Sequence, residues 1–184
     1  MIKKVLSILL LWFPIISVSA QDLAVYEAKG PVKQIQWKSN EYRPYPIPYF
    51  HETQQFTRSG RLIGFEQRYY AERDRKGRMK REGMDPTDAY HWHYDRLGRV
   101  IWVFYNRRGD YEFTPKIIYP FYTTKGEVGK YRIHYGDPSD IGDVLDELTV
   151  HVTERDSHGN WTKRRHVSSD GRNTYIEERS ITYY

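Results

Sequence analysis

A turn phrase that occurs seven times along the chain sets the strongest limit on its fold. Each copy begins with Asp, Asn, Ser or Thr and has a glycine three residues later, and in six copies an apolar residue follows two places after the glycine. The copies begin at Thr57, Asp74, Asp95, Asn106, Thr123, Asp156 and Ser168. The polar first residue can bond the backbone two residues on and open a type I turn, and glycine takes the left-handed conformation that closes such a loop. Seven turns of this kind predict a meander of β-hairpins.

The segments between the turns alternate apolar and polar residues, as strands do. In Tyr90–Tyr94 the aromatic rings share one face, and His91 and His93 share the other. Residues 100–105 are apolar on both faces, which predicts a central strand covered on both sides. Further strands are expected at 32–38, 62–70, 161–167 and 174–183. The charged residues Glu177, Glu178 and Arg179 of the segment at 174–183 predict that this strand has an open face and lies at the edge of the sheet.

Together these patterns predict an all-β fold, a single antiparallel meander of hairpins with about seven to ten strands. We expect the sheet to be twisted and either open or partly curled. The acidic segment at 138–147 has room for at most one short helix. Three prolines at alternate positions make 43–50 an extended segment outside the ladder. No linker divides the chain, so residues 21–184 are expected to form one β-rich domain, with turn–strand units over 56–183.

Residues 1–20 have the features of a secretory signal peptide. Lys3 and Lys4 precede a nearly unbroken apolar stretch, and Val18-Ser19-Ala20 places small residues at the cleavage position. The stretch is short for a membrane span, which needs about 20 residues, and Pro14 interrupts it. We expect cleavage after Ala20 and no membrane span in the remaining chain.

The composition limits the partners and the chemistry. The chain has no cysteine, which excludes disulfides, thiolate metal sites and a lipid anchor on an N-terminal cysteine. Its 29 basic and 24 acidic residues give a mixed surface that does not favour nucleic acid. We therefore expect a protein of the bacterial periplasm or the cell exterior, with no lipid anchor, no nucleic-acid partner and no cofactor.

The turn phrases also resemble a known repeat. Tyr94-Asp95-Arg96-Leu97-Gly98-Arg99-Val100 resembles the YD repeat of the rearrangement-hotspot (RHS) family, and the segment from Glu154 to Tyr183 is similar to a degenerate form found in small exported bacterial proteins. The match covers most of 56–183, although one copy alone keeps the Tyr-Asp pair and the glycines lie 11 to 33 residues apart. The resemblance implies a strand-rich repeat architecture. It brings no catalytic residues with it.

The histidines and carboxylates offer two further kinds of chemistry. His91 and His93 share a strand face and could ligate one metal if His134 or His151 lay on a neighbouring strand. Because no cysteine can complete a structural zinc site, we favour two solvent-facing histidines and no metal. A glycosidase needs two carboxylates across a cleft. The sequence singles out no such pair, and it has no Gly-x-Ser-x-Gly elbow.

Aromatic residues are the best candidates for a binding surface. Rings on a proline-stiffened backbone are presented at little ordering cost and could stack on sugars or fill a partner's pocket, unless the segment packs over the sheet as a lid. The candidate binding residues are Tyr42, Tyr45, Tyr49, Phe50, Trp92, Tyr119 and Tyr122.

We therefore expect an exported, non-enzymatic binding or structural module of the bacterial envelope. Its partner would be a glycan, an envelope protein or a second copy of the chain. The alternative is a small periplasmic hydrolase of envelope glycan or peptide material, with an acid–base pair that the sequence does not identify.

Overall fold

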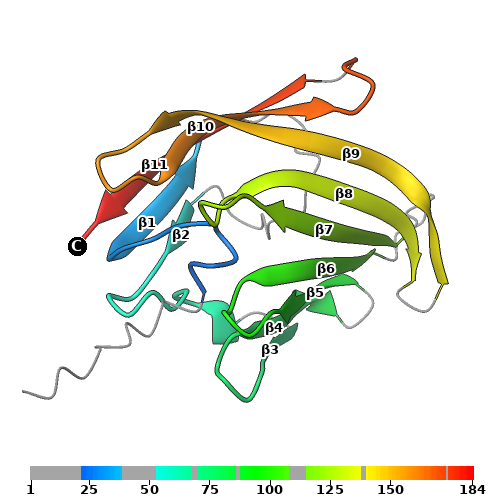
Figure 1. The fold of residues 1–184 in the computed structure, drawn as a ribbon. Coiled ribbons are helices and arrows are strands. Elements are labelled where there is room, and N and C mark those ends of the chain that lie inside the picture. Colours follow the sequence, from blue (N-terminus) through cyan, green and yellow to red (C-terminus); the bar gives the residue numbers. More distant parts are fainter. Residues whose placement is uncertain are drawn as a thin grey trace, which may run out of the picture.

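In the part of the chain that the structure describes, eleven strands form one antiparallel sheet (Figure 1). The computed structural model describes residues 22–38, 53–67, 70–85, 88–107, 115–137, 140–172 and 174–184. The strands are β1 (Val32–Trp37), β2 (Thr53–Gln55), β3 (Tyr70–Arg73), β4 (Met79–Asp85), β5 (Asp88–Tyr94), β6 (Val100–Arg107), β7 (Lys116–Tyr122), β8 (Val128–Asp137), β9 (Asp140–Arg155), β10 (Trp161–Ser168) and β11 (Thr174–Tyr183). Their order across the sheet is β2-β1-β11-β10-β9-β8-β7-β6-β5-β4-β3, so the predicted all-β meander is confirmed.

The sheet curves around the segment that precedes β1. Figure 1 shows β9 and β10 above this segment and β3 to β6 below it, while the chain from residue 22 to residue 30 runs through the concave side. Two clusters of buried apolar side chains among the described residues line this concave inner face. One cluster joins residues 22–28 to β1 and β4 to β6, and a second joins β7, β8 and β9.

The turns follow the predicted design. At Asp95 the Gly98 N–H donates to the Asp95 carbonyl (3.1 Å), and the Asp95 N–H donates to the carbonyl of Arg99 (2.9 Å). The Asp95 carboxylate accepts from the N–H groups of Leu97 and Arg99, and Gly98 has φ +82°. Positive φ recurs at the glycines of five other copies, 60, 77, 126, 159 and 171, and the seventh copy falls partly outside the described residues. The predicted glycine-closed reversals are confirmed at these six positions.

Five of these turns lie at the same end of the sheet. In an antiparallel meander every second turn lies at one end, which brings together the turns at 74–79, 95–100, 123–128 and 156–161. β1 runs antiparallel to β11, so the turn at 57–62, which follows β2, joins them. We call this the turn end of the sheet.

The acidic segment, for which at most one short helix is expected, contains no helix in its described part, because residues 140–147 belong to β9. Two expectations need correction. Residues 62–67 form turns and a 3-10 helix, η1 (Phe65–Gln67), in place of the predicted strand, because Phe65 turns inward and is fully buried. The expected edge position of 174–183 is wrong, because β11 pairs with β10 on one side and with β1 on the other.

Two predicted features of strand faces are confirmed. In β5, Trp92 is buried on the inner face while His93 is exposed on the outer one. In β6, Val103 and Phe104 point to opposite faces and are both buried, as expected for a central strand. The proline segment at 43–50 lies outside the described residues. Among the described residues no helix has the length and apolar character needed to cross a membrane.

The turn glycines lead to a first prediction. Gly171 has φ +70°, and a Cβ added there would meet no atom within 4 Å, so the cost of Gly171→Ala is backbone strain alone. We expect Gly171→Ala to lower the free energy of unfolding by about 1–2 kcal/mol in urea titrations. Gly171→Asn should lower the free energy of unfolding by less, because Asn adopts the left-handed region more readily than Ala does. Ser169→Ala, exposed in the same turn, is the control, and an alanine at 171 as stable as this control would contradict the account.

Candidate functional site

The segment at 22–30 is held inside the curled sheet by polar contacts as well as by packing. Asp22 is fully buried and accepts hydrogen bonds from the Leu62 N–H (2.7 Å) and from the Arg73 guanidinium of β3 (2.8 and 3.0 Å). At the other end of the segment, the Asn160 side chain accepts from the Lys29 N–H (2.8 Å) and donates to the Lys29 carbonyl (2.9 Å). These contacts connect the segment to both halves of the sheet.

Arg179 of β11 binds the middle of this segment. Its guanidinium donates to the carbonyls of Tyr26 and Glu27 and to that of Trp161 (2.9 Å for Glu27 and Trp161). The guanidinium also lies over the Trp161 ring, 3.5 Å from the centroid. A fully buried arginine is tolerated here because three backbone carbonyls and an aromatic face replace its water.

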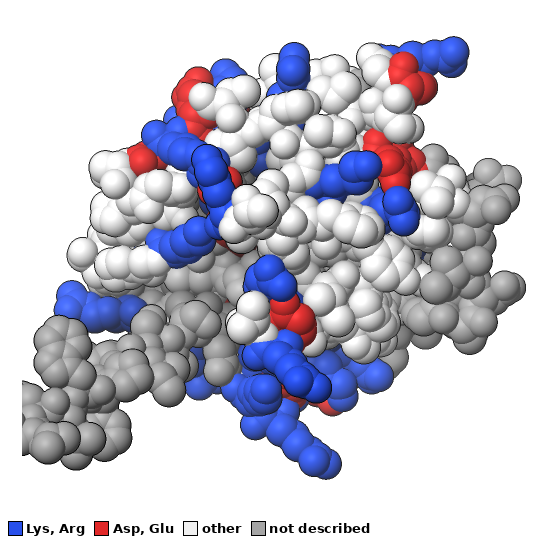
Figure 2. Space-filling model, viewed as in Figure 1, with Lys and Arg blue, Asp and Glu red and all other residues white. Residues whose placement is uncertain are grey.

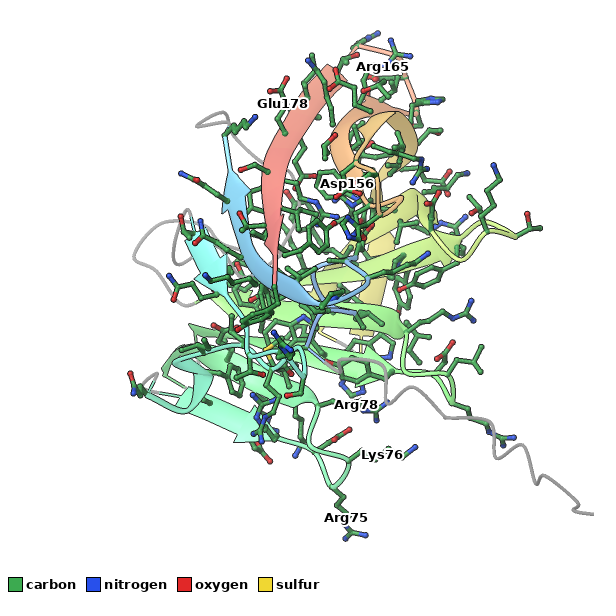
Figure 3. The ribbon with its side chains drawn as sticks, turned by 90° about the vertical axis from the view of Figure 1, so that its left-hand side faces the viewer. Arg75, Lys76, Arg78, Asp156, Arg165 and Glu178 are labelled. Carbon is green, nitrogen blue, oxygen red and sulfur yellow. The ribbon has the colours of Figure 1, made fainter. Side chains whose placement is uncertain are left out.

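A second buried arginine links two carboxylates. Arg164 of β10 donates to Glu177 (2.7 Å) and to Glu27 (2.8 Å), and Tyr131 of β8 donates to the other Glu27 oxygen. Glu177 also accepts from the indole of Trp37 (3.2 Å). Arg164 and Glu177 are both buried, whereas Figure 3 shows their sequence neighbours Arg165 and Glu178 at the periphery of the sheet.

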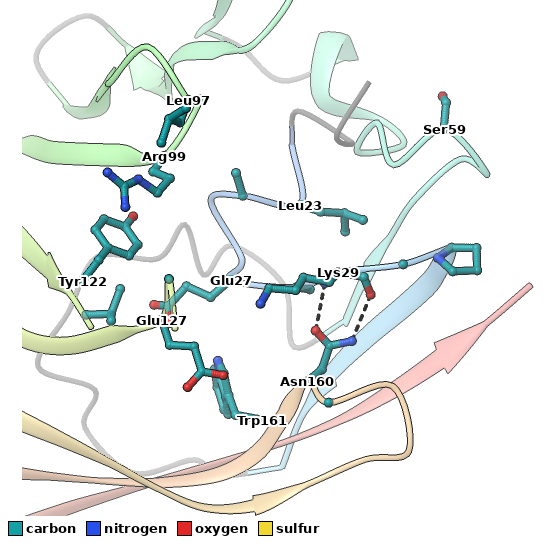
Figure 4. A pocket seen from close by; sticks show the side chains of 18 of the residues that line it. Leu23, Glu27, Lys29, Ser59, Leu97, Arg99, Tyr122, Glu127, Asn160 and Trp161 are labelled. Carbon is teal, nitrogen blue, oxygen red and sulfur yellow. Dashed lines mark hydrogen bonds between the residues drawn. The ribbon is translucent and has the colours of Figure 1, made fainter. Parts of the chain in front are cut away.

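A cavity of about 550 Å³ lies at the turn end, beside the entry of the segment into the sheet. Its walls come from residues 23–31 and from the turns at 57–62, 95–100, 123–128 and 156–161. Its largest polar and aromatic lining residues include Glu27, Lys29, Arg99, Tyr122, Glu127, Asn160 and Trp161, all labelled in Figure 4. Arg58 also lines it. A volume of this order suits a small organic ligand, since such pockets typically measure about 300–1,000 Å³.

Glu27 has an unusual backbone at this cavity. With φ +49°, it is the one non-glycine residue of positive φ among the described residues. Such a conformation costs about 1–3 kcal/mol and persists where the surroundings hold it. Here Arg179 holds its carbonyl, and Arg164 and Tyr131 hold its carboxylate. The cavity wall is therefore rigidly placed.

The predicted binding residues have different positions. Tyr122 lines the cavity, where its hydroxyl donates to the Val100 carbonyl (2.9 Å) and its ring faces the Arg99 guanidinium. Tyr119 is half-buried and packs edge-on against His134. Trp92 is only 3 % exposed and belongs to the core. The other candidates, Tyr42, Tyr45, Tyr49 and Phe50, lie outside the described residues, so their role stays a prediction.

The candidate metal ligands lie on the outer face of β5. His93 stacks on Trp102 (3.5 Å between centroids), and His91 packs edge-on against Phe104. Burial lowers the pKa of both imidazoles, assisted by the nearby Arg81 and Lys80. Across the described ranges, no three His, Asp or Glu side chains gather in a way that could hold a metal ion.

Several lining residues had no signal of their own in the sequence. Lys29, Arg58 and Trp161 belong to separate turns or to the chain entry, and nothing in their local pattern marks a site. The usable signal is the order of the turns along the chain, because every second turn of a meander lies at the same end of the sheet. That reasoning brings Gly98, Gly126 and Gly159 to the cavity, as observed.

The comparisons with known proteins give no family. No protein-family model matches the chain, and no curated protein matches its sequence.

The buried charges predict a dependence of stability on pH. Burial raises the pKa of Glu177, but the charge of Arg164 and the hydrogen bonds of His166 and Arg164 outweigh it and hold the pKa well below the usual value of about 4.3. Because the folded pKa is depressed, the stabilisation is complete above the unfolded pKa and is lost as pH falls below it. Glu177→Gln should therefore be much less stable than the wild type at pH 7, and the difference should shrink as pH falls from about 5 to 2.

Denaturant titrations across this pH range measure the effect. Glu178→Gln is the matched control, because Glu178 pairs with Lys163 on the outer face, where solvent screens the pair. A stability difference between the wild type and Glu177→Gln that stays constant with pH would contradict this assignment.

Proposed function

We propose that the protein is an exported, non-enzymatic binding module of the bacterial envelope, and that it takes a small ligand into the cavity at the turn end. The observation that carries this proposal is the cavity itself, about 550 Å³, with walls made by four turns and a buried segment. Each turn is closed by its own hydrogen bonds, so the walls are formed before any ligand arrives. Preformed walls reduce the ordering cost of binding.

The carboxylates of the cavity support binding rather than acid–base catalysis. Glu27 and Glu127 both line it, but each is held by an arginine. Hydrogen bonds from Arg155 lower the pKa of Glu127, which keeps this carboxyl ionised, and both Glu27 oxygens already accept from Arg164 and Tyr131. A glycosidase needs one carboxylic acid with a raised pKa to protonate the leaving group. The hydrolase alternative therefore has no supporting pair at this site.

The sequence supports the compartment and the repeat architecture. Residues 1–20 have the pattern of a cleaved signal peptide, and the absence of cysteine excludes a lipid anchor on an N-terminal cysteine. The resemblance of residues 94–100 to a YD repeat favours a small exported member of that class. In this interpretation the repeated turns supply the rim of a binding cavity.

Filling the cavity tests the proposal. Ala24 is half-buried and lines the cavity, so Ala24→Phe should place a ring in it. Immobilised wild-type protein should retain a glycan or small molecule from envelope extracts, identified by mass spectrometry, and Ala24→Phe should lose at least about tenfold in retention. The control is Thr149→Phe, a substitution at an exposed position of β9 outside the cavity. The eluted ligand should have an unchanged mass, whereas a shortened product would favour the hydrolase.

Two outcomes would contradict the proposal. In one, the wild type retains nothing from the extracts or from a glycan array. In the other, Ala24→Phe retains the same ligand as the wild type, which would place binding elsewhere on the molecule.

A further inference from the structure

The polar groups of the cavity that remain available are donors and cations. The Lys29 ammonium lines the cavity, is exposed, and makes no hydrogen bond to a described side chain. Arg58 contacts the Tyr184 ring at 5.4 Å and forms no ion pair within the described chain. Trp161 lines the cavity, and its indole N–H is buried and has no hydrogen-bond partner among the described residues. A buried donor of this kind favours an acceptor atom on a ligand.

The carboxylates and the amide side chain of the same cavity are already engaged. Both Glu127 oxygens accept from Arg155 (2.6 and 2.8 Å), and both Glu27 oxygens accept from Arg164 and Tyr131. The Asn160 side chain is fixed to the Lys29 backbone, as the dashed lines in Figure 4 show. A ligand that mainly donates hydrogen bonds would therefore meet carboxylate oxygens that already accept them. A ligand that accepts hydrogen bonds would meet donors that have no hydrogen-bond partner among the described residues.

The surroundings of the mouth have an excess of positive charge. Six exposed cations belong to the turn end and form no ion pair with a described carboxylate: Lys29, Arg58, Arg75, Lys76, Arg96 and Lys125. The acids of the same turns are used internally, since Asp74 pairs with Arg78 and Asp95 pairs with Arg99. Figure 3 shows Arg75 and Lys76 pointing outward at the tip of the β3–β4 turn, and basic side chains stand out on the lower part of the face in Figure 2. A field of one sign attracts ligands of the opposite charge.

The remaining walls are apolar. Leu23, Val128 and the Trp161 ring line the interior, and Leu97 projects at the rim with 76 % of its surface exposed. An inorganic ion would leave these walls without a partner. A sugar ring or a similar body offers C–H faces that pack on aromatic and aliphatic surfaces.

We propose that the cavity binds a small organic anion, in which a carboxylate or phosphate is carried on a ring-sized body with an apolar face, and that Lys29, Arg58 and the Trp161 indole N–H bind the anionic group. An acidic sugar from an envelope polysaccharide and a sugar phosphate share this chemistry. The inference rests on the proposed function, because it names the ligand class of the same cavity.

Binding of defined compounds tests the ligand class. The probes are digalacturonate for the carboxylate, glucose 6-phosphate for the phosphate, cellobiose as a neutral sugar, and inorganic phosphate as a bare anion. Isothermal titration and tryptophan fluorescence should show one of the two sugar anions binding at least about tenfold more tightly than cellobiose and phosphate, and more weakly as salt increases.

Three variants test the assigned groups. Lys29→Met and Arg58→Gln should each weaken binding of the sugar anion about tenfold, and Trp161→Phe, which keeps a ring but removes the donor, about threefold or more. Lys76→Met and Arg75→Gln are matched controls, because these exposed cations lie on the β3–β4 turn outside the cavity, and binding should change less than about twofold. Lys29 and Arg58 are exposed side chains, so their variants should stay folded even if Trp161→Phe does not.

The outcomes separate this inference from the proposed function. Binding of cellobiose at least as tight as that of the sugar anions, no binding of either anion at millimolar concentration, or unchanged binding in Lys29→Met and Arg58→Gln would each overturn the anion assignment. The proposed function would still stand if a neutral envelope ligand is retained and Ala24→Phe abolishes its retention. Anion binding that Ala24→Phe leaves intact would overturn both.

Discussion

The burial of two arginines against the segment at 22–28 is the interaction on which the rest of the structure depends. The concave face of the sheet has to be covered, and the segment at 22–28 covers it. The segment is short and has polar backbone groups that a β-ladder would normally satisfy. Arg179 supplies donors to the carbonyls of Tyr26 and Glu27, and Arg164 neutralises the Glu27 carboxylate. Without these partners, buried polar groups would each cost about 1–3 kcal/mol.

The same interaction positions the candidate site. Because the segment leaves the interior at Lys29, where Asn160 holds its backbone, it passes between the turn at 156–161 and the turns of β5 to β8. The cavity is the space between this segment and the turn tips. A site of this kind needs no dedicated loop, since every wall is a turn or a chain entry that the fold already requires. The cations Lys29 and Arg58 lie at exposed positions of the chain entry and of a turn, where substitutions are tolerated more easily than in the core.

Much of the fold could be predicted from the sequence, because the residues of each turn phrase determine the conformation of that turn. Asp95 with Gly98 defines a reversal locally, and alternation on either side defines the strand faces. The expected edge position of β11 is wrong because β1, a strand far earlier in the chain, pairs with its second side. The local sequence also gives no sign that Glu177 and Arg179 are buried, because their burial depends on Arg164 and on the carbonyls of residues 26 and 27. Those contacts span more than 130 positions for the segment, and no local pattern contains them. For the same reason Tyr122 is the one candidate at the cavity among the three that the structure describes, and the sequence does not predict Lys29 and Arg58.

The accessibility of the segment at 22–28 to a reagent in solution tests the central claim most directly. The chain has no cysteine, so Val25→Cys introduces a single thiol at a position that is 6 % exposed, and Leu97→Cys introduces one at the exposed turn tip. Reaction rates with an aromatic disulfide reagent then report whether the segment lies inside the sheet. We expect the thiol at 25 to react at least about a hundredfold more slowly than the thiol at 97 in the native protein, and equally fast in denaturant. Equal rates in the native protein would show that the segment is not held in the sheet, and would contradict the account of both the fold and the cavity.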